Sequence, residues 1–300
     1  MDISTWRDLR RGLSGEDVRE WQVVLATDGF LLPGDADDQF GPKTEKATVS
    51  YQIAHGLKAD GIVGPSTRAT IGAPEPTPVV VSDLFDSRWR FLQAQNYTKV
   101  TGIRSVSLVP MHTMQAPDRP DTAEGVASWF SGARGPAPQA SSHVCGDVDS
   151  IVQCVKPNDI AWGVQGGNSI SYNCEQGGYA EWTRDEWLGP VNLPMLKLMA
   201  SHVRLALDHF RLPLVVLTEA EVANCVRDAL IAQGKLTGAR SGTVGGICEH
   251  RDLTQVWQQW QKYGLPNPRA GAKPFWPTHV DCGDGYPIDV LLDLVKASAP

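Results

Sequence analysis

The sequence predicts two domains: a small all-α module of three helices, and a larger α/β domain whose mixed central β-sheet is flanked by helices. A chain of 300 residues is about twice the length of a typical domain. Residues 73–82 read APEPTPVVVS, and their alternating prolines favour an extended, semi-rigid linker. Helical spacing prevails before this stretch, whereas strand-like segments alternate with helices after it. We therefore expect domains over residues 1–72 and 85–300, joined by a linker over 73–84.

The composition argues against several classes of protein. The net charge is −7 and Lys and Arg are not clustered, so we expect no nucleic-acid partner. Apolar runs are far shorter than the roughly 18 residues of a membrane-spanning helix, so we expect no stable membrane insertion. The opening segment MDISTWRDLRRG lacks the apolar stretch of a signal peptide, which predicts synthesis in the cytoplasm. The six cysteines have no CxxC spacing, and we expect reduced thiols, with one bridge (Cys145–Cys154 or Cys225–Cys248) as the alternative.

The small module contains an internal repeat. Residues 37–44 (DDQFGPKT) recur as residues 60–67 (DGIVGPST), with the shared pattern D-x-x-apolar-G-P-x-T. Each copy predicts a tight turn that leads into a helix, because Pro suits the first helical turn and Thr can satisfy its free amides. An earlier helix is indicated by residues at helical spacing: Val18, Trp21, Gln22 and Leu25.

The larger domain shows alternating strand and helix signals. Residues 105–109 are β-prone and place His112 just after a strand. Residues 141–144 and 149–153 predict a strand pair, and residues 122–130 and 192–211 have helical spacing. Thr218, with Glu221 three residues later, predicts a capping box at the start of a helix over 218–233.

Several titratable residues of this domain fall outside the predicted helices. His279 and Asp281 are two apart, so on a strand they would face the same side. Zinc hydrolases commonly combine three His, Asp or Cys ligands with an open position for water. No local spacing motif connects His112, His250 and Asp281, so the pattern alone does not select the ligands.

The small module resembles a known family. Its sequence contains LRRGLSGEDVREWQ, then DDQFGPKT, then QIAHGLKADGIVGPST. Over residues 9–71 it is similar to the helical peptidoglycan-binding domain of bacterial and phage wall hydrolases, with Trp21 in place of the usual Leu. The resemblance implies that the module binds bacterial peptidoglycan.

The larger domain carries a second resemblance. The blocks SLVPMHTMQAP, SSHV, AWGVQGGN, NCEQGGYAEW, CEHRD and HVDCGDGYPID follow one another between residues 104 and 296. In this order they resemble the type 2 N-acetylmuramoyl-L-alanine amidases, a family similar to peptidoglycan recognition proteins. The nearest likeness is to phage endolysins of actinobacterial hosts, the lysin A type of mycobacteriophages.

The resemblance implies a zinc site. His112 and His250 match the first two ligands of Zn²⁺, and Asp281 matches the third. Cys282 stands where the family usually has Pro, and relatives can use Cys as the third ligand. Cys282 therefore remains the alternative to Asp281, although the alignment of the DCGDGYPID block favours Asp281.

The resemblance also implies the remaining site residues. Glu175 matches the acidic residue that moves the proton, and His279 occupies the position that supports the oxyanion. Trp162 and Asn168 would line the groove for sugar or peptide, and His143 would line or pack the site.

The implied reaction is hydrolysis of the amide between the lactyl group of N-acetylmuramic acid and L-Ala. The implied protein is a monomeric endolysin that acts on the wall after release through a partner pore. A non-catalytic peptidoglycan sensor and a zinc peptidase of the stem peptide are the alternatives. A serine or cysteine hydrolase is disfavoured because no G-x-S-x-G occurs and no Cys lies in a recognisable catalytic context.

Overall fold

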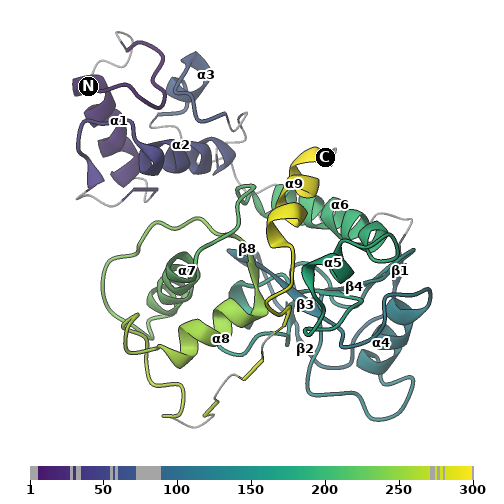
Figure 1. The fold of residues 1–300 in the computed structure, drawn as a ribbon. Helices are drawn as coiled ribbons and strands as arrows, with labels where there is room; N and C mark the ends of the chain where they lie inside the picture. The colour runs from purple at the N-terminus through teal and green to yellow at the C-terminus, as the bar shows by residue number, and fades with distance from the viewer. Residues whose placement is uncertain are drawn as a thin grey trace.

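The computed structural model describes residues 6–27, 30–31, 35–54, 57, 60–71, 89–270, 274–275, 278–279 and 281–298 (Figure 1). The fold class is as predicted, with a helical N-terminal part and an α/β part built on a central sheet. The predicted linker over 73–84 lies outside the described residues, so the domain boundaries stay a prediction. Among the described residues, no helix is long and apolar enough to cross a membrane.

The N-terminal part consists of three helices, α1 (Glu16–Thr27), α2 (Pro42–Ala54) and α3 (Pro65–Arg68). Their core contains Trp21, which is fully buried and lies edge-on to Tyr51 with ring centroids 4.9 Å apart. The indole Nε1 of Trp21 donates to Thr48 Oγ1 at 2.8 Å. Trp21 is therefore held in the core by a hydrogen bond as well as by packing.

Each copy of the repeat is hydrogen-bonded to a buried glutamine. Gln22 Nε2 donates to Asp37 Oδ1, Gln39 O and Thr44 Oγ1 at 2.9–3.0 Å. Gln52 Nε2 lies 2.8–3.1 Å from the equivalent atoms of the second copy: Asp60 Oδ1, Ile62 O and Thr67 Oγ1. The repeated Asp and Thr are thus partners of a buried amide, which explains the pattern by local structure.

The larger part contains a six-stranded sheet with the order β1-β5-β4-β7-β3-β8 and a two-stranded ribbon, β2-β6, among the described residues. In the larger sheet, β4 and β5 pair antiparallel and the other neighbours run parallel. The strands are β1 (Arg90–Phe91), β2 (Tyr97–Thr98), β3 (Leu108–Thr113), β4 (Val144–Gly146), β5 (Ile151–Gln153), β6 (Ile160–Ala161), β7 (Cys174–Gln176) and β8 (Gly246–Glu249).

Helices cover both faces of this sheet (Figure 1). Helices α6 and α9 pack with Val109 and Met111 of β3, whereas α7 and α8 pack on the face that contains Leu108. Because side chains alternate along a strand, His112 points to the same face as Leu108. The helices are α4 (Thr122–Phe130), α5 (Arg184–Trp187), α6 (Leu193–Phe210), α7 (Glu219–Ala232), α8 (His250–Gln258) and α9 (Ile288–Ala297), with a 3₁₀ helix η3 (Asn168–Ile170).

Most predicted elements of this part are present. The predicted helices correspond to α4, α6 and α7, and the predicted strand pair to β4 and β5. Thr218 and Glu221 form the predicted capping box. The strand predicted over 105–109 is displaced: β3 begins at Leu108 and includes His112. The strand begins where Leu108 pairs with Gly246, the first residue of β8.

Candidate functional site

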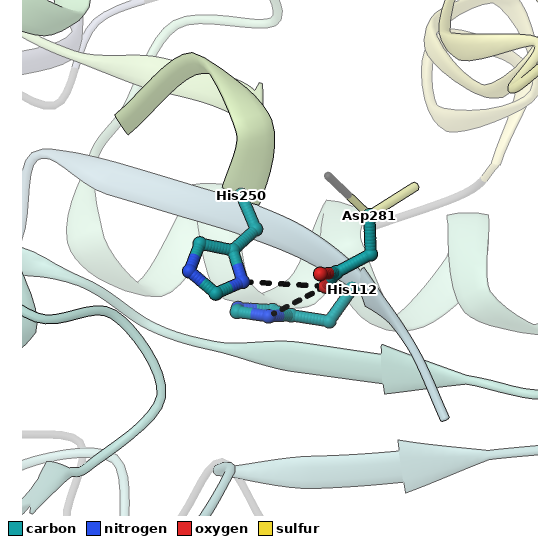
Figure 2. Close-up of side chains that lie close together, drawn as sticks. All are labelled: His112, His250 and Asp281. Atoms are coloured by element: carbon teal, nitrogen blue, oxygen red, sulfur yellow. Dashed lines mark hydrogen bonds and ion pairs between the residues drawn. The ribbon is translucent and has the colours of Figure 1, made fainter. Parts of the chain in front are cut away.

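Three side chains from distant parts of the sequence meet at one end of the sheet (Figure 2). His112 lies in β3, His250 is the first residue of α8, and Asp281 lies in a turn before α9. Oδ2 of Asp281 is 3.4 Å from Nδ1 of His112 and 3.2 Å from Nδ1 of His250. One carboxylate oxygen of Asp281 therefore faces the Nδ1 atoms of both histidines.

The local fold explains how His250 and Asp281 reach His112. Strand β8 pairs parallel to β3 and runs directly into α8. His250 therefore lies beside His112, at the carboxyl ends of these two strands. Glu249 and Asp252 form a capping box that fixes the first turn of α8. The Arg251 amide donates to Asp281 O at 2.9 Å, which ties the turn to the start of this helix.

The electrostatics of the cluster favour an ionised carboxylate beside a neutral histidine. Burial would raise the pKa of Asp281, but hydrogen bonds from His112 and His250 outweigh it and hold that pKa well below its usual range. Burial lowers the pKa of His250 to about 4, so its ring is neutral at pH 7. Burial also lowers the pKa of His112, but the carboxylates of Asp281 and Glu175 outweigh this effect and raise it.

The donor set fits a zinc ion. Two neutral imidazoles and one carboxylate are typical ligands of a catalytic zinc site, which leaves a fourth position open. The ligand atoms of His112, His250 and Asp281 all lie within 4.8 Å of one another. Zinc bonds of about 2.0–2.1 Å in a tetrahedron place ligand atoms roughly 3.3 Å apart, and the two nitrogen–oxygen distances in this cluster are 3.4 and 3.2 Å.

Glu175 lies beside this cluster. It is the register partner of His112 on the neighbouring strand β7, and its Oε1 is 3.9 Å from Nδ1 of His112. Its side chain is 16% exposed, and its Oε2 atom is buried without a hydrogen-bond partner among the described residues. Burial raises the pKa of Glu175 to about 7, with a further increase from Asp281 and an opposing effect of His112. Such a carboxyl is suited to exchanging a proton near neutral pH.

His279 lies at the rim of the cluster. Its side chain is 67% exposed, and its ring stacks on His250 with centroids 4.8 Å apart. Its Nδ1 atom is 3.9 Å from Oδ1 of Asp281. The expectation that His279 and Asp281 share a strand is wrong, because Asp281 is in a turn and His279 is in irregular structure. The stacking on His250, and not the alternation of a strand, brings His279 to the site.

The alternative ligand Cys282 lies elsewhere. Its side chain is fully buried in the apolar cluster that contains Tyr286 and Trp187. Gln176 Nε2 lies 3.6 Å from its sulfur. Burial raises the pKa of this thiol well above its usual value, which disfavours the thiolate that a metal would need. The geometry favours Asp281, and all six cysteines are free and buried.

The residues expected to line a groove have structural contacts. Asn168 Oδ1 accepts from the Val164 amide at 2.7 Å, and Trp162 Nε1 donates to Thr98 Oγ1 at 2.9 Å. The ring of His143 is fully buried, and its Nδ1 accepts from the Asn173 amide at 2.9 Å. A role of Trp162 and Asn168 in substrate binding stays a prediction, whereas His143 packs in the core.

Asn173 belongs to the site but did not emerge from the sequence. Its Oδ1 atom lies 3.1 Å from Nε2 of His112, on the side of the ring that faces away from Asp281. Asn173 is two residues before Glu175, next to the start of β7. Because i and i+2 of an extended segment share a face, that spacing was the available signal.

Comparisons with known proteins give a family match for the N-terminal part of the chain. Residues 14–71 match a family model described as a peptidoglycan binding domain. A protein of Bacillus licheniformis named "Probable N-acetylmuramoyl-L-alanine amidase" is 46% identical over 68 residues, which are 22% of this chain and 19% of that protein. A zinc D-Ala-D-Ala carboxypeptidase of Streptomyces albus G is 46% identical over 67 residues, 21% of this chain and 26% of that protein.

Among solved structures, the hydrolase AmiA of Staphylococcus aureus in complex with its ligand is similar. The similarity covers 69% of this chain and 80% of that one, with 16% identity and a TM-score of 0.40. The chain spans about a fifth to a quarter of the length of the two curated relatives named above.

Proposed function

We propose that this protein is a zinc-dependent N-acetylmuramoyl-L-alanine amidase that acts as an endolysin. It hydrolyses the amide bond between the lactyl group of N-acetylmuramic acid and L-Ala of bacterial peptidoglycan. The observation that carries this proposal is the meeting of His112, His250 and Asp281 at one edge of the sheet, with Glu175 beside them. The resemblance of the sequence blocks around these residues to type 2 amidases supports the choice of bond.

His112, His250 and Asp281 would hold the zinc ion, since their ligand atoms converge and their chemistry suits it. When bound, zinc supplies Lewis acidity that polarises the scissile carbonyl and acidifies the attacking water. Ligand histidines must be unprotonated at the coordinating nitrogen, so binding would release any proton held on Nδ1. Asp281 supplies the negative charge that this arrangement needs.

Glu175 is the general base and acid of this proposal. It accepts a proton from the attacking water as the carbon–oxygen bond forms at the carbonyl carbon. It then returns a proton to the nitrogen of L-Ala as the carbon–nitrogen bond breaks, which gives a free amine and a lactyl carboxylate. The raised pKa of Glu175, about 7, supports both transfers near neutral pH.

His279 stabilises the negative charge that develops on the carbonyl oxygen. A ring N–H of His279 would donate towards that oxygen, and its position on the rim, stacked on His250, supports this role. Trp162 and Asn168 would line the groove that receives sugar or peptide.

The small module holds the enzyme on its substrate. The match of residues 14–71 to a peptidoglycan binding domain supports this targeting. In this proposal the domains are residues 1–72 and 85–300, joined by the linker over 73–84. The protein acts as a monomer in host-cell lysis by a bacteriophage, after synthesis in the cytoplasm and release to the wall.

Cleavage of a soluble muramyl peptide tests the reaction. The full chain is stripped with a chelator, divided, and assayed with and without added zinc. We expect N-acetylmuramic acid and a peptide with free N-terminal L-Ala only in the zinc-treated sample. Cleavage within the peptide would identify a zinc peptidase instead, and intact substrate in both samples would overturn the proposed activity.

A further inference from the structure

The ring of His112 has two nitrogens, and only one of them faces the proposed metal position. Nδ1 lies 3.4 Å from Asp281 Oδ2, whereas Nε2 lies 3.1 Å from Asn173 Oδ1. A histidine that binds a metal through Nδ1 must carry its remaining proton on Nε2. The residue that accepts this proton decides which tautomer the ring adopts.

We propose that Asn173 is a positioning residue that keeps a proton on Nε2 of His112, so that Nδ1, which faces Asp281, is the nitrogen left to bind the metal. This inference rests on the proposed zinc site and adds a residue to it. Asn173 is fully buried, so no water competes for the Nε2 proton of His112. In the opposite arrangement the Asn173 amide would donate to Nε2, and the proton on Nδ1 would oppose binding of a cation.

The backbone of Asn173 is held on several sides. Its amide donates to His143 Nδ1 at 2.9 Å, and its carbonyl accepts from the His143 amide at 3.1 Å and from Ser142 Oγ at 2.9 Å. His143 is itself fully buried and stacks on Tyr172 with centroids 4.5 Å apart. The side chain of Asn173 therefore projects from a rigid backbone towards His112.

Gly163 provides the space for this amide. A Cβ atom at position 163 would lie 2.8 Å from Cγ and 2.9 Å from Oδ1 of Asn173. Both distances are shorter than a normal carbon contact, so any larger residue would displace the Asn173 side chain from His112. The glycine, the buried amide and the imidazole therefore form one packed unit.

Nuclear magnetic resonance of the zinc-free, full-length protein tests the tautomer without any metal or activity. In ¹⁵N-labelled protein, long-range correlations of the His112 ring, assigned with His112→Gln, show which nitrogen carries a proton. We expect Nε2 to be protonated and its proton to exchange slowly with solvent. An unprotonated Nε2 in the wild-type protein would overturn the inference.

Zinc affinity supplies the second readout, measured by competition with a chromophoric chelator. Asn173→Leu removes the acceptor, and Gly163→Ala displaces it; both should raise the zinc dissociation constant about 10- to 100-fold. Asn173→Asp retains an acceptor oxygen and should keep wild-type affinity. Asn224→Leu is the matched control, since it makes the same change in α7, where the Asn224 amide bonds to Thr243 Oγ1 at 3.3 Å and not to a residue of the site.

The outcomes separate this inference from the proposed function. Wild-type zinc affinity in both Asn173→Leu and Gly163→Ala would refute the role of Asn173, whatever the protein hydrolyses. A protein that binds zinc and shows the Nε2 proton, yet cleaves no muramyl amide, would refute the proposed activity and leave the inference standing.

Discussion

Glu175 lies directly opposite His112 on the neighbouring parallel strand, with its Oε1 atom 3.9 Å from Nδ1 of the histidine. The pairing places the proposed proton carrier and a proposed metal ligand on one face of the sheet. Their side chains come from separate strands, so proton transfer and metal binding can be tested by separate substitutions.

Substitution of Glu175 should separate chemistry from metal binding. We expect Glu175→Gln to lower kcat by about 10²- to 10⁴-fold, because general acid and base catalysis contributes on that order. The zinc content of the purified variant, measured by atomic absorption, should equal that of the wild type. Full activity in Glu175→Gln would contradict the role of Glu175 as general base and acid.

Substitution of the third ligand should distinguish Asp281 from Cys282. Asp281→Ala should lose both bound zinc and activity, since it removes the carboxylate that faces both histidines. Cys282→Ala should keep its zinc, because the thiol of Cys282 lies in the apolar core. The reverse pattern of zinc contents would assign the metal to the cysteine.

Loss of the buried amide should weaken the small module. Gln52→Ala leaves Asp60, Ile62 O and Thr67 without their shared donor. It also removes Gln52 Oε1, which accepts from the buried Gly61 amide at 2.9 Å. Leaving such an amide unpaired costs about 1–3 kcal/mol, and we expect a loss of this size in the free energy of unfolding. Amide hydrogen exchange of α1 and α2 reports this module separately from the rest of the chain.

The control for this measurement is Arg11→Ala, which removes an exposed ion pair with Glu45. Surface pairs of this kind contribute about 0–1 kcal/mol. If Gln52→Ala and Arg11→Ala change exchange equally, the buried glutamine does not organise the repeat.

Asp118 should make folding stability depend on pH. Burial, with Asp147 and Asp149 nearby, raises the pKa of Asp118 to about 7, against an opposing hydrogen bond from the Val148 amide. The folded state therefore binds this proton more tightly than the unfolded state, whose pKa is about 3.9. The stabilisation is complete below that lower pKa and is lost as the pH rises through about 7.

Urea unfolding at pH 5 and pH 8 checks this linkage. Asp118→Asn removes the titration, so the stability of the variant relative to the wild type should be more favourable at pH 8 than at pH 5. Asp121→Asn, at an exposed position nearby, is the matched control. A relative stability of Asp118→Asn that is identical at the two pH values would contradict the assignment.

Local signals were sufficient for much of the fold. The capping box at Thr218 and Glu221 and the spacing of residues 122–130 depend on neighbours within one helix, and both predictions are confirmed. The predicted start of the first strand was wrong, because β3 begins where Leu108 pairs with Gly246, a residue far away in the sequence.

The candidate site was only partly predictable. His112, His250 and Asp281 were identified through a resemblance to a family, since no spacing motif connects them. Asn173 and Gly163 were missed, because their importance depends on how closely two distant segments approach. The stacking of His279 on His250 likewise depends on the fold and not on local alternation.

Digestion of purified bacterial wall by the full chain tests the central claim most directly. The released fragments are analysed by mass spectrometry, with and without a chelator and after zinc is restored. We expect free N-terminal L-Ala on intact stem peptides, lost with the chelator and regained with zinc. New ends elsewhere in the stem peptide, or retention on the wall without any new ends, would contradict the account.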